Sequence, residues 1–256
     1  MPLKLFRRVA EGLSAKREYR GQPGARVYAV GDIHGRLDLL DQLLGQIEDD
    51  IVDRPVERAA LVFLGDLIDR GPDSAGVIQR LRTLDGFPAK TSFLLGNHEE
   101  MFLRAIDGES GIAHDWLRFG GDACVESYGL PPFALEAVEE DRLGRLLTEA
   151  VPSEHVAFLR GFGDSISFGD YLFVHAGIRP GIAIEDQDPH DLRWIRRPFL
   201  SDIQDHGCMV VHGHTITDGV EERSNRIGID TGAYQSGVLT AIAIEDDQRW
   251  YLATGG

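Results

Sequence analysis

Carboxylate, imidazole and amide side chains gather in five short, glycine-containing clusters along the chain. In order, these are Gly31-Asp-Ile-His-Gly35, Gly65-Asp-Leu-Ile-Asp-Arg-Gly71, Gly96-Asn-His-Glu99, His175-Ala-Gly177 and His212-Gly-His-Thr215. Oxygen and imidazole ligands without thiolate suit hard or borderline divalent cations. Any one of these residues alone is better explained as a turn former or a helix cap, but the clusters together favour a metal site.

An apolar run stands directly before each of these clusters. The runs are 26–30, 59–64, 92–95, 171–174 and 209–211. Between the first three, leucine, isoleucine and valine recur at helical spacing in 37–51 and 77–84. Strands that alternate with helices predict parallel pairing, with the helices lying over the sheet. Because the carboxyl ends of such strands open on one crevice, we expect the polar clusters to converge there.

The second half of the chain has a different pattern. Short apolar runs follow one another between turns, at 165–168, 171–174, 209–211, 226–229, 238–244 and 249–252. They predict a second, largely antiparallel or mixed sheet. The region from about 108 to 161 contains Trp116, Phe119, Gly120-Gly121 and Pro131-Pro132, and we interpret it as a helical insertion. Two packed sheets with helices outside, an αββα sandwich of the α/β class, would bury both apolar faces.

The composition limits the classes of function. The 256 residues are 43% hydrophobic, which suffices for one sizeable core and is near the upper limit of a single domain. A net charge of −16 disfavours a nucleic-acid partner, since such proteins are normally basic. Cys124 and Cys208 form no CxxC pair, so we expect reduced thiols and a cytoplasmic protein. No apolar run has the length of a membrane span.

The N-terminal residues 1–24 are basic and end at the turn-rich Gly21-Gln-Pro-Gly24. They lack the apolar stretch of a secretory signal. We expect a solvated, flexible arm, followed by a single domain over 25–256. A short surface-binding helix, with Leu3, Phe6 and Leu13 on one face, is the alternative for the arm.

The clusters resemble the phosphoprotein phosphatase (PPP) family of metallophosphoesterases. Gly-Asp-Ile-His-Gly, Gly-Asp-Leu-Ile-Asp-Arg-Gly and Gly-Asn-His-Glu stand in the family's order, and the two later histidine clusters complete the set. The match spans about 27–244. A series of this kind is far more specific than a lone motif. It implies the calcineurin-like fold, with two packed mixed sheets flanked by helices.

Three further features resemble the bacterial and phage branch of the family. They are Trp116 with Gly120-Gly121, Trp194-Ile-Arg196 and Ile229-Asp-Thr-Gly232. The eukaryotic members' C-terminal inhibitor-binding segment is not evident, so we expect no regulatory subunit of the eukaryotic type.

The resemblance implies two divalent metal ions that share one carboxylate ligand, Asp66. The other ligands would be Asp32 and His34 for one ion, and Asn97, His175 and His214 for the second. Manganese is the expected metal, and iron, zinc and magnesium are the alternatives.

It also implies the groups that act on the substrate. His98 would be the general acid beside the leaving oxygen, and Asp69 would orient it. Arg70 would clamp the phosphoryl oxygens. Arg196 is the candidate for a second clamp, with the adjacent Arg197 as its rival because spacing alone does not separate them.

The roles of two more polar residues, His212 of the last cluster and Asp230, are left open. His212 ligates in parts of the wider superfamily, but here the family match falls on His214, so we expect His212 in packing or in support of a ligand. Asp230 is a candidate for orienting a ligand. The remaining histidines have no motif context and are expected to be ordinary surface or packed residues: His114, His155, His190 and His206.

The implied activity is hydrolysis of a phosphomonoester by direct attack of a hydroxide that bridges the metals. The expected substrate is a protein or peptide phosphorylated on serine or threonine, with tyrosine as a further class. A symmetrical bis(5'-nucleosyl)-tetraphosphatase is the alternative. The glutamate after His98 and the threonine after His214 favour the phosphatase, since the hydrolases typically differ at both places. A non-catalytic scaffold that binds phosphorylated partners is a third reading, disfavoured because every implied position is filled.

Overall fold

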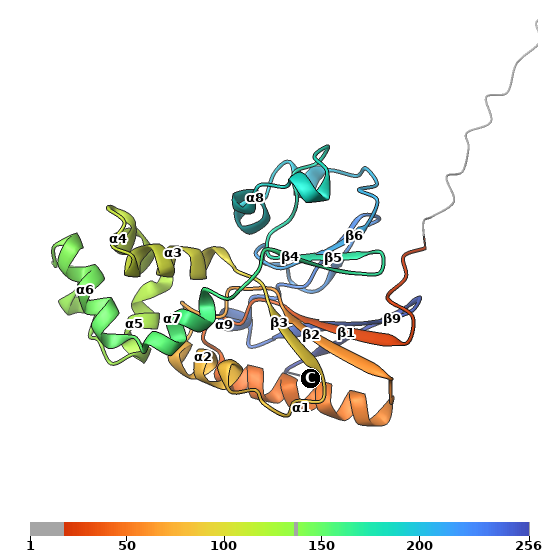
Figure 1. The fold of residues 1–256 in the computed structure, drawn as a ribbon, viewed down its shortest axis with the longest axis horizontal. Helices are drawn as coiled ribbons and strands as arrows, with labels where there is room; N and C mark the ends of the chain where they lie inside the picture. The colour runs from red at the N-terminus through yellow and green to blue at the C-terminus, as the bar shows by residue number, and fades with distance from the viewer. Residues whose placement is uncertain (1–17, 136–137, 256) are drawn as a thin grey trace, which may run out of the picture.

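The computed structural model describes residues 18–135 and 138–255 (Figure 1). Two five-stranded sheets pack against each other, and helices lie on their outer sides. This confirms the predicted sandwich of two mixed sheets flanked by helices.

The first sheet has the strand order β10-β9-β1-β2-β3. Its parallel strands are β1 (Ala25–Val30), β2 (Arg58–Phe63) and β3 (Lys90–Phe93). β9 (Thr240–Glu245) runs antiparallel to β1 and to β10 (Gln248–Ala253). The turn pattern grouped these last two strands with the second sheet, and that prediction was wrong. Apolar alternation identifies a strand but does not specify its distant partner.

The second sheet has the strand order β4-β5-β6-β8-β7. β5 (Tyr171–Val174), β6 (Met209–His212) and β8 (Arg226–Gly228) pair in parallel. β4 (Ser165–Phe168) and β7 (Glu221–Glu222) close the two edges as antiparallel strands. The sheet is therefore mixed, as predicted, and its parallel centre directs the ends of β5 and β6 the same way.

The strands alternate their side chains between two apolar layers. Along β1, Val27 and Ala29 join the layer between the sheets, where they meet Phe173 of the second sheet. Tyr28 and Val30 point to the opposite face and join the layer beneath the helices. Both layers are buried, so β1 has the continuously apolar character of a central parallel strand.

Helices cover the outer faces and gather at one end of the sandwich. α1 (Leu37–Asp53) and α2 (Ser74–Arg82) pack on the first sheet, and α8 (Pro189–Trp194) packs on the second. The others are α3 (Asn97–Ile106), α4 (Ile112–Trp116), a π-type turn η1 (Leu117–Gly121), α5 (Asp122–Ser127), α6 (Glu140–Ala150), α7 (Ser153–Leu159) and α9 (Ala233–Ser236). Figure 1 shows α3 to α7 together beyond one end of the sheets. The predicted insertion at 108–161 contains α4 to α7, while the domain limits remain a prediction.

Part of the predicted N-terminal arm is folded against the domain. Tyr19 is buried in the layer between the sheets, and Gly21 N donates to Asp246 O at 2.7 Å. Residues 1–17, with most of the arm's basic side chains, lie outside the described residues. Among the described helices, none combines the length and apolar character that a bilayer crossing requires.

Candidate metal centre

The five polar clusters follow the ends of β1, β2, β3, β5 and β6, as predicted from their positions after apolar runs. Their convergence buries all six predicted ligands, none of which is more than 7% exposed: Asp32, His34, Asp66, Asn97, His175 and His214. Two sheets contribute to one site, because β5 and β6 bring their histidines to the crevice formed by the first sheet.

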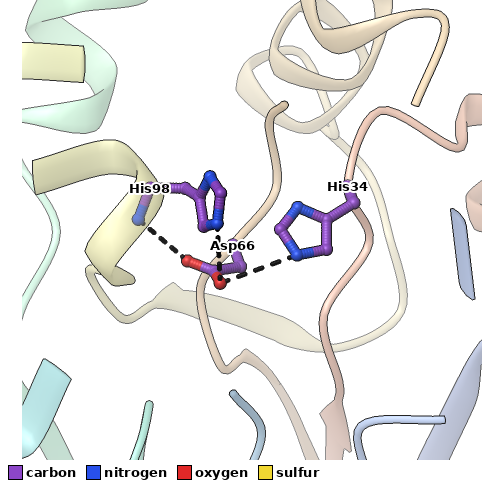
Figure 2. Close-up of side chains that lie close together, drawn as sticks. All are labelled: His34, Asp66 and His98. Atoms are coloured by element: carbon purple, nitrogen blue, oxygen red, sulfur yellow. Dashed lines mark hydrogen bonds and ion pairs between the residues drawn. The ribbon is translucent and has the colours of Figure 1, made fainter. Parts of the chain in front are cut away.

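Asp66 lies at the centre of the site. Its Oδ2 is 3.7 Å from His34 Nε2 and 4.0 Å from His98 Nε2. Figure 2 shows both rings directed at this carboxylate. Its Oδ1 is 3.4 Å from His175 Nε2. Asp66 thus belongs to two groups whose ligand atoms lie within 4.8 Å of one another, the first with His34 and His98 and the second with His175 and His214. One carboxylate between two sets of imidazoles can serve two cations.

Asn97 and Asp32 complete the contacts around this carboxylate. Asn97 Oδ1 is 3.0 Å from His175 Nε2 and 2.8 Å from His214 Nδ1. Asp32 accepts from the backbone N–H of His214, at 3.0 Å to Oδ2. The first turn of α3 also faces the site, since His98 N donates to Asp66 Oδ1 at 3.1 Å. All six predicted ligands are therefore brought together in one buried cluster.

The histidine tautomers leave lone pairs directed at this cluster. His34 Nδ1 lies 2.7 Å from Ile68 O and His175 Nδ1 lies 2.9 Å from Leu64 O, and a carbonyl can only accept. His34 Nε2 then carries a lone pair, which lies 2.9 Å from Arg70 NH1. His175 Nε2 faces Asn97 Oδ1 and Asp66 Oδ1. Burial lowers the pKa of this histidine, but the charge of Asp66 outweighs burial and leaves the pKa raised. Such a convergence of acceptors is favourable only around a proton or a cation, and a carbonyl on the other ring nitrogen is the usual arrangement of a metal-bound histidine.

Electrostatics point to the same need for positive charge. Burial raises the pKa of Asp32 well above its usual value, and the nearby Asp230 and Asp66 carboxylates raise it further. Burial and Asp66 raise the pKa of Glu99 to about 7. Burial lowers the pKa of His34 to about 3, which keeps this ring neutral. Neutral imidazoles beside carboxylates that repel one another fit a divalent cation.

The backbone is strained where these side chains emerge. Six described non-glycine residues have a positive φ, and five of them are in the site: His34 (47°), Asp66 (49°), Asp69 (71°), Arg70 (66°) and His214 (63°). Each such residue costs roughly 1–3 kcal/mol and persists only where its surroundings hold it. Gly213 and Gly96 show how close the packing is, because a Cβ on them would overlap Asp32 Oδ1 and Asp66 Oδ1 respectively.

His98 and Asp69 form a buried pair beside Asp66. His98 Nδ1 lies 2.6 Å from Asp69 Oδ2, so Nε2 faces the cluster (Figure 2). Burial lowers the pKa of His98, but the charges of Asp66 and Asp69 outweigh it and leave the pKa raised. Trp116 Nε1 donates to the same Asp69 oxygen at 2.8 Å.

The arginines predicted as phosphate clamps lie near the cluster. Arg70 NH1 is 2.9 Å from His34 Nε2, and its guanidinium lies 5.2 Å from the ring centre of Tyr234. Arg196 is exposed just after α8, and its charge is among the causes that lower the pKa of His214 to about 2, after burial and the charge of His175. This proximity favours Arg196 over Arg197, which remains the alternative.

His212 and Asp230 lie beside the cluster. His212 is buried against the Phe199 ring, at 5.2 Å between centres, and belongs to neither metal-ligand group. Asp230 Oδ1 accepts from Gly232 N at 2.9 Å, and its carboxyl is close enough to Asp32 to raise the pKa of that group. A supporting role for both residues stays a prediction.

Comparison with known proteins agrees with this geometry. The family model described as calcineurin-like phosphoesterase matches residues 25–233. The chain belongs to this family. It is 30% identical over 228 residues to a protein named serine/threonine-protein phosphatase 2 from Escherichia coli (strain K12), covering 86% of this chain and 93% of the relative. It is 38% identical over 277 aligned positions to a symmetrical bis(5'-nucleosyl)-tetraphosphatase of Legionella pneumophila (strain Philadelphia 1), covering 87% and 95%.

Solved structures show the same fold. A crystal structure provisionally described as a diadenosine tetraphosphatase aligns with a TM-score of 0.64 at 21% identity, over 93% of this chain and 100% of that chain. The cold-active protein-tyrosine phosphatase of a psychrophilic Shewanella species aligns with a TM-score of 0.53 at 19% identity, over 91% and 83%. The chain is thus a metallophosphoesterase with the calcineurin-like fold, a phosphoric monoester hydrolase with a site for divalent metal.

Two residues that support this metallophosphoesterase site had no role assigned from the sequence. Glu99 is fully buried, and its two carboxylate oxygens accept from the backbone N–H groups of Asp66, Leu67, Ile68 and Gly96. Its place at the end of Gly-Asn-His-Glu was the available signal. Tyr234 packs edge-on against His34 at 5.4 Å, and no feature of the sequence pointed to it.

Proposed function

We propose that this metallophosphoesterase is a two-metal protein phosphatase that acts on phosphoserine and phosphothreonine, with phosphotyrosine as a further substrate class. One observation carries the hydrolytic activity in this proposal, and the choice of a phosphoprotein substrate rests on Glu99 and Thr215 of the sequence motifs. A single buried carboxylate, Asp66, lies between His34 on one side and His175 and His214 on the other, and the His98–Asp69 pair stands beside it. A pair of cation sites next to a proton donor is an arrangement that can catalyse phosphoester hydrolysis.

In this proposal Asp32, His34 and Asp66 hold one ion. Asn97, His175 and His214 hold the second together with Asp66, and manganese is the expected metal. Two such ions lower the pKa of a bound water and neutralise phosphoryl oxygens. The chain supplies the rest, beginning with the low-dielectric surroundings that strengthen these interactions.

The proposed roles of the other side chains follow from their positions. Arg70 and Arg196 hold phosphoryl oxygens, since a planar guanidinium presents two parallel N–H groups to an oxyanion. His98 gives the proton on Nε2 to the leaving oxygen. Asp69 accepts from Nδ1, which fixes the ring and stabilises its charged form.

A His98→Asn variant tests the acid. We expect it to keep its metal and to lose turnover by about 10²–10⁴-fold on a phosphoserine peptide, whose alkoxide needs a proton. Turnover should fall much less with 4-nitrophenyl phosphate, whose leaving group is stable as an anion. Undiminished activity on phosphoserine would contradict the assignment.

The alternative activity is that of a symmetrical bis(5'-nucleosyl)-tetraphosphatase, which the names of several relatives favour. Parallel assays with phosphopeptides and diadenosine tetraphosphate separate the two, each run with manganese, magnesium, zinc and iron. Hydrolysis of the dinucleotide at a much higher kcat/KM than every phosphopeptide would overturn the proposal in favour of the alternative.

A further inference from the structure

The turn that follows α4 contacts two consecutive residues of the site. Trp116, the last residue of α4, donates its indole N–H to Asp69 Oδ2 at 2.8 Å. Gly120, four residues later, accepts from Arg70 N at 2.9 Å through its carbonyl. The residues so held are the proposed partner of the acid and the proposed phosphate clamp.

Asp69 and Arg70 need such support because both have left-handed backbone conformations, with φ of 71° and 66°. Their side chains cannot reach His98 and the cluster unless the surroundings stabilise this conformation. Ser74 Oγ accepts from Asp69 N at 2.9 Å and supplies a third contact. Hydrogen bonds from α2 and from the helical region 112–121 therefore hold Asp69 and Arg70 from two sides.

The geometry of η1 fixes the indole as well. Trp116 is fully buried and packs against Phe102 at 5.2 Å between ring centres. A Cβ on Gly121 would approach the indole to 2.5 Å, so only glycine fits there. Gly120 has a φ of 111° and lies against Arg70, where a Cβ would come within 2.6 Å of Cγ. The Gly120-Gly121 pair lets Trp116 and the carbonyl of Gly120 reach the site together.

The orientation of His98 depends on the hydrogen bond between Trp116 and Asp69. Asp69 is fully buried, and its Oδ2 accepts from both His98 Nδ1 and Trp116 Nε1. The indole is a donor only, so it fixes which carboxylate oxygen faces the histidine. Without it, Oδ2 keeps only its contact with His98, and the direction of His98 Nε2 is less defined.

We infer that Trp116 is a positioning residue for proton transfer, which holds Asp69 so that His98 points at the leaving oxygen. This inference rests on the proposed role of His98 as the acid. The insertion at 108–161 then helps to orient the acid, in addition to packing against the other helices.

Trp116→Phe tests the inference, because it keeps an aromatic ring and removes the N–H. We expect kcat on phenyl phosphate, a poor leaving group, to fall about tenfold, while kcat on 4-nitrophenyl phosphate falls less than about twofold. Metal content should not change. Trp250→Phe is the matched control: its indole also donates to a carboxylate, Asp50, at 3.2 Å, but on β10 far from the chemistry. Equal losses on both substrates, or no loss, would overturn the inference.

A double-mutant cycle separates this inference from the proposed function. In a His98→Asn background, Trp116→Phe should have no further leaving-group-dependent effect, because both changes act through one proton transfer. If His98→Asn itself shows no dependence on the leaving group, the proposed acid is wrong. If it shows that dependence and Trp116→Phe does not, only the inference about Trp116 is wrong.

The inference also has a test that does not require the Trp116→Phe variant. In the wild-type protein labelled with ¹⁵N-tryptophan, the Trp116 indole N–H should exchange slowly with solvent and resonate downfield. Asp69→Asn should shift that signal, with those of Trp194 and Trp250 unchanged. An unshifted Trp116 signal would contradict the hydrogen bond on which the inference depends.

Discussion

Replacing Glu99 by glutamine removes one of the two oxygens that hold the Asp66 loop. Oε2 accepts from Asp66 N at 2.9 Å and from Gly96 N at 3.0 Å, while Oε1 accepts from Leu67 N at 2.8 Å and Ile68 N at 3.3 Å. Whichever way the new amide is turned, its NH₂ faces two backbone N–H groups. A buried donor without a partner costs about 1–3 kcal/mol, so the two backbone N–H groups alone cost about 2–6 kcal/mol.

Charge repulsion between Glu99 and Asp66 opposes this loss of stability, so the metal content and the pH must be chosen before the unfolding free energy is measured. Asp66 repels the Glu99 charge and helps to raise its pKa to about 7, after burial. Removing that charge relieves the repulsion, so part of the loss is offset in the metal-free protein. With metal bound, Asp66 is neutralised and the relief disappears. We therefore expect the larger loss of unfolding free energy in the metal-loaded protein, measured by urea denaturation well above that pKa.

The same substitution should weaken metal binding. Glu99 holds the backbone on both sides of Asp66 without being a ligand, and loss of such a supporting group typically lowers metal affinity 10–100-fold. Isothermal titration with manganese measures this directly. Glu154→Gln, on the exposed surface of α7, is the control and should change neither quantity. A stability loss below about 1 kcal/mol with unchanged manganese affinity would refute the reasoning.

Three further predictions concern the same cluster. Asp66→Asn should abolish activity together with at least one of two metals per chain, measured by elemental analysis, and retention of both metals would contradict the bridging role. Gly213→Ala should weaken metal binding and lower the melting temperature, because the new Cβ would overlap Asp32 Oδ1. Gly86→Ala is the control: its φ of +80° is unfavourable for alanine, but nothing lies near its Cβ, so it should lower only the melting temperature. Metal affinity should fall as the pH drops below about 7, because the pKa values of His175 and Glu99 are raised and their protons must leave when metal binds. Calorimetry in two buffers with different ionisation enthalpies counts the protons released. A metal affinity that does not change with pH would contradict this prediction.

The sequence predicted the ligands because each stands next to the strand that positions it. Asp32 follows β1 and Asp66 follows β2, so local patterns of apolar residues and glycine were enough to locate them. The pairing of β1, β2 and β3 followed from the intervening helices. The placement of β9 beside β1 did not, since that pairing joins residues at opposite ends of the chain.

The supporting contacts were harder to predict for the same reason. Trp116 and Asp69 are 47 positions apart, and Glu99 and Asp66 are 33 apart. No periodicity in the sequence encodes such a contact, because it arises only after the helices have packed. Trp116 was identified only as a family feature, and its hydrogen bond to Asp69 required the structure.

The residues of the cluster act on the phosphoryl group, which a phosphoprotein and a dinucleoside tetraphosphate have in common. Relatives of both names share this core over most of their length. The cluster alone therefore cannot select between the substrates, and selection must come from groups that contact the leaving side. Phe119 is 65% exposed in η1, directly before the glycine that holds Arg70, while Ile216 is 37% exposed just after His214. Phe119 therefore belongs to the same turn that holds Arg70 through the carbonyl of Gly120.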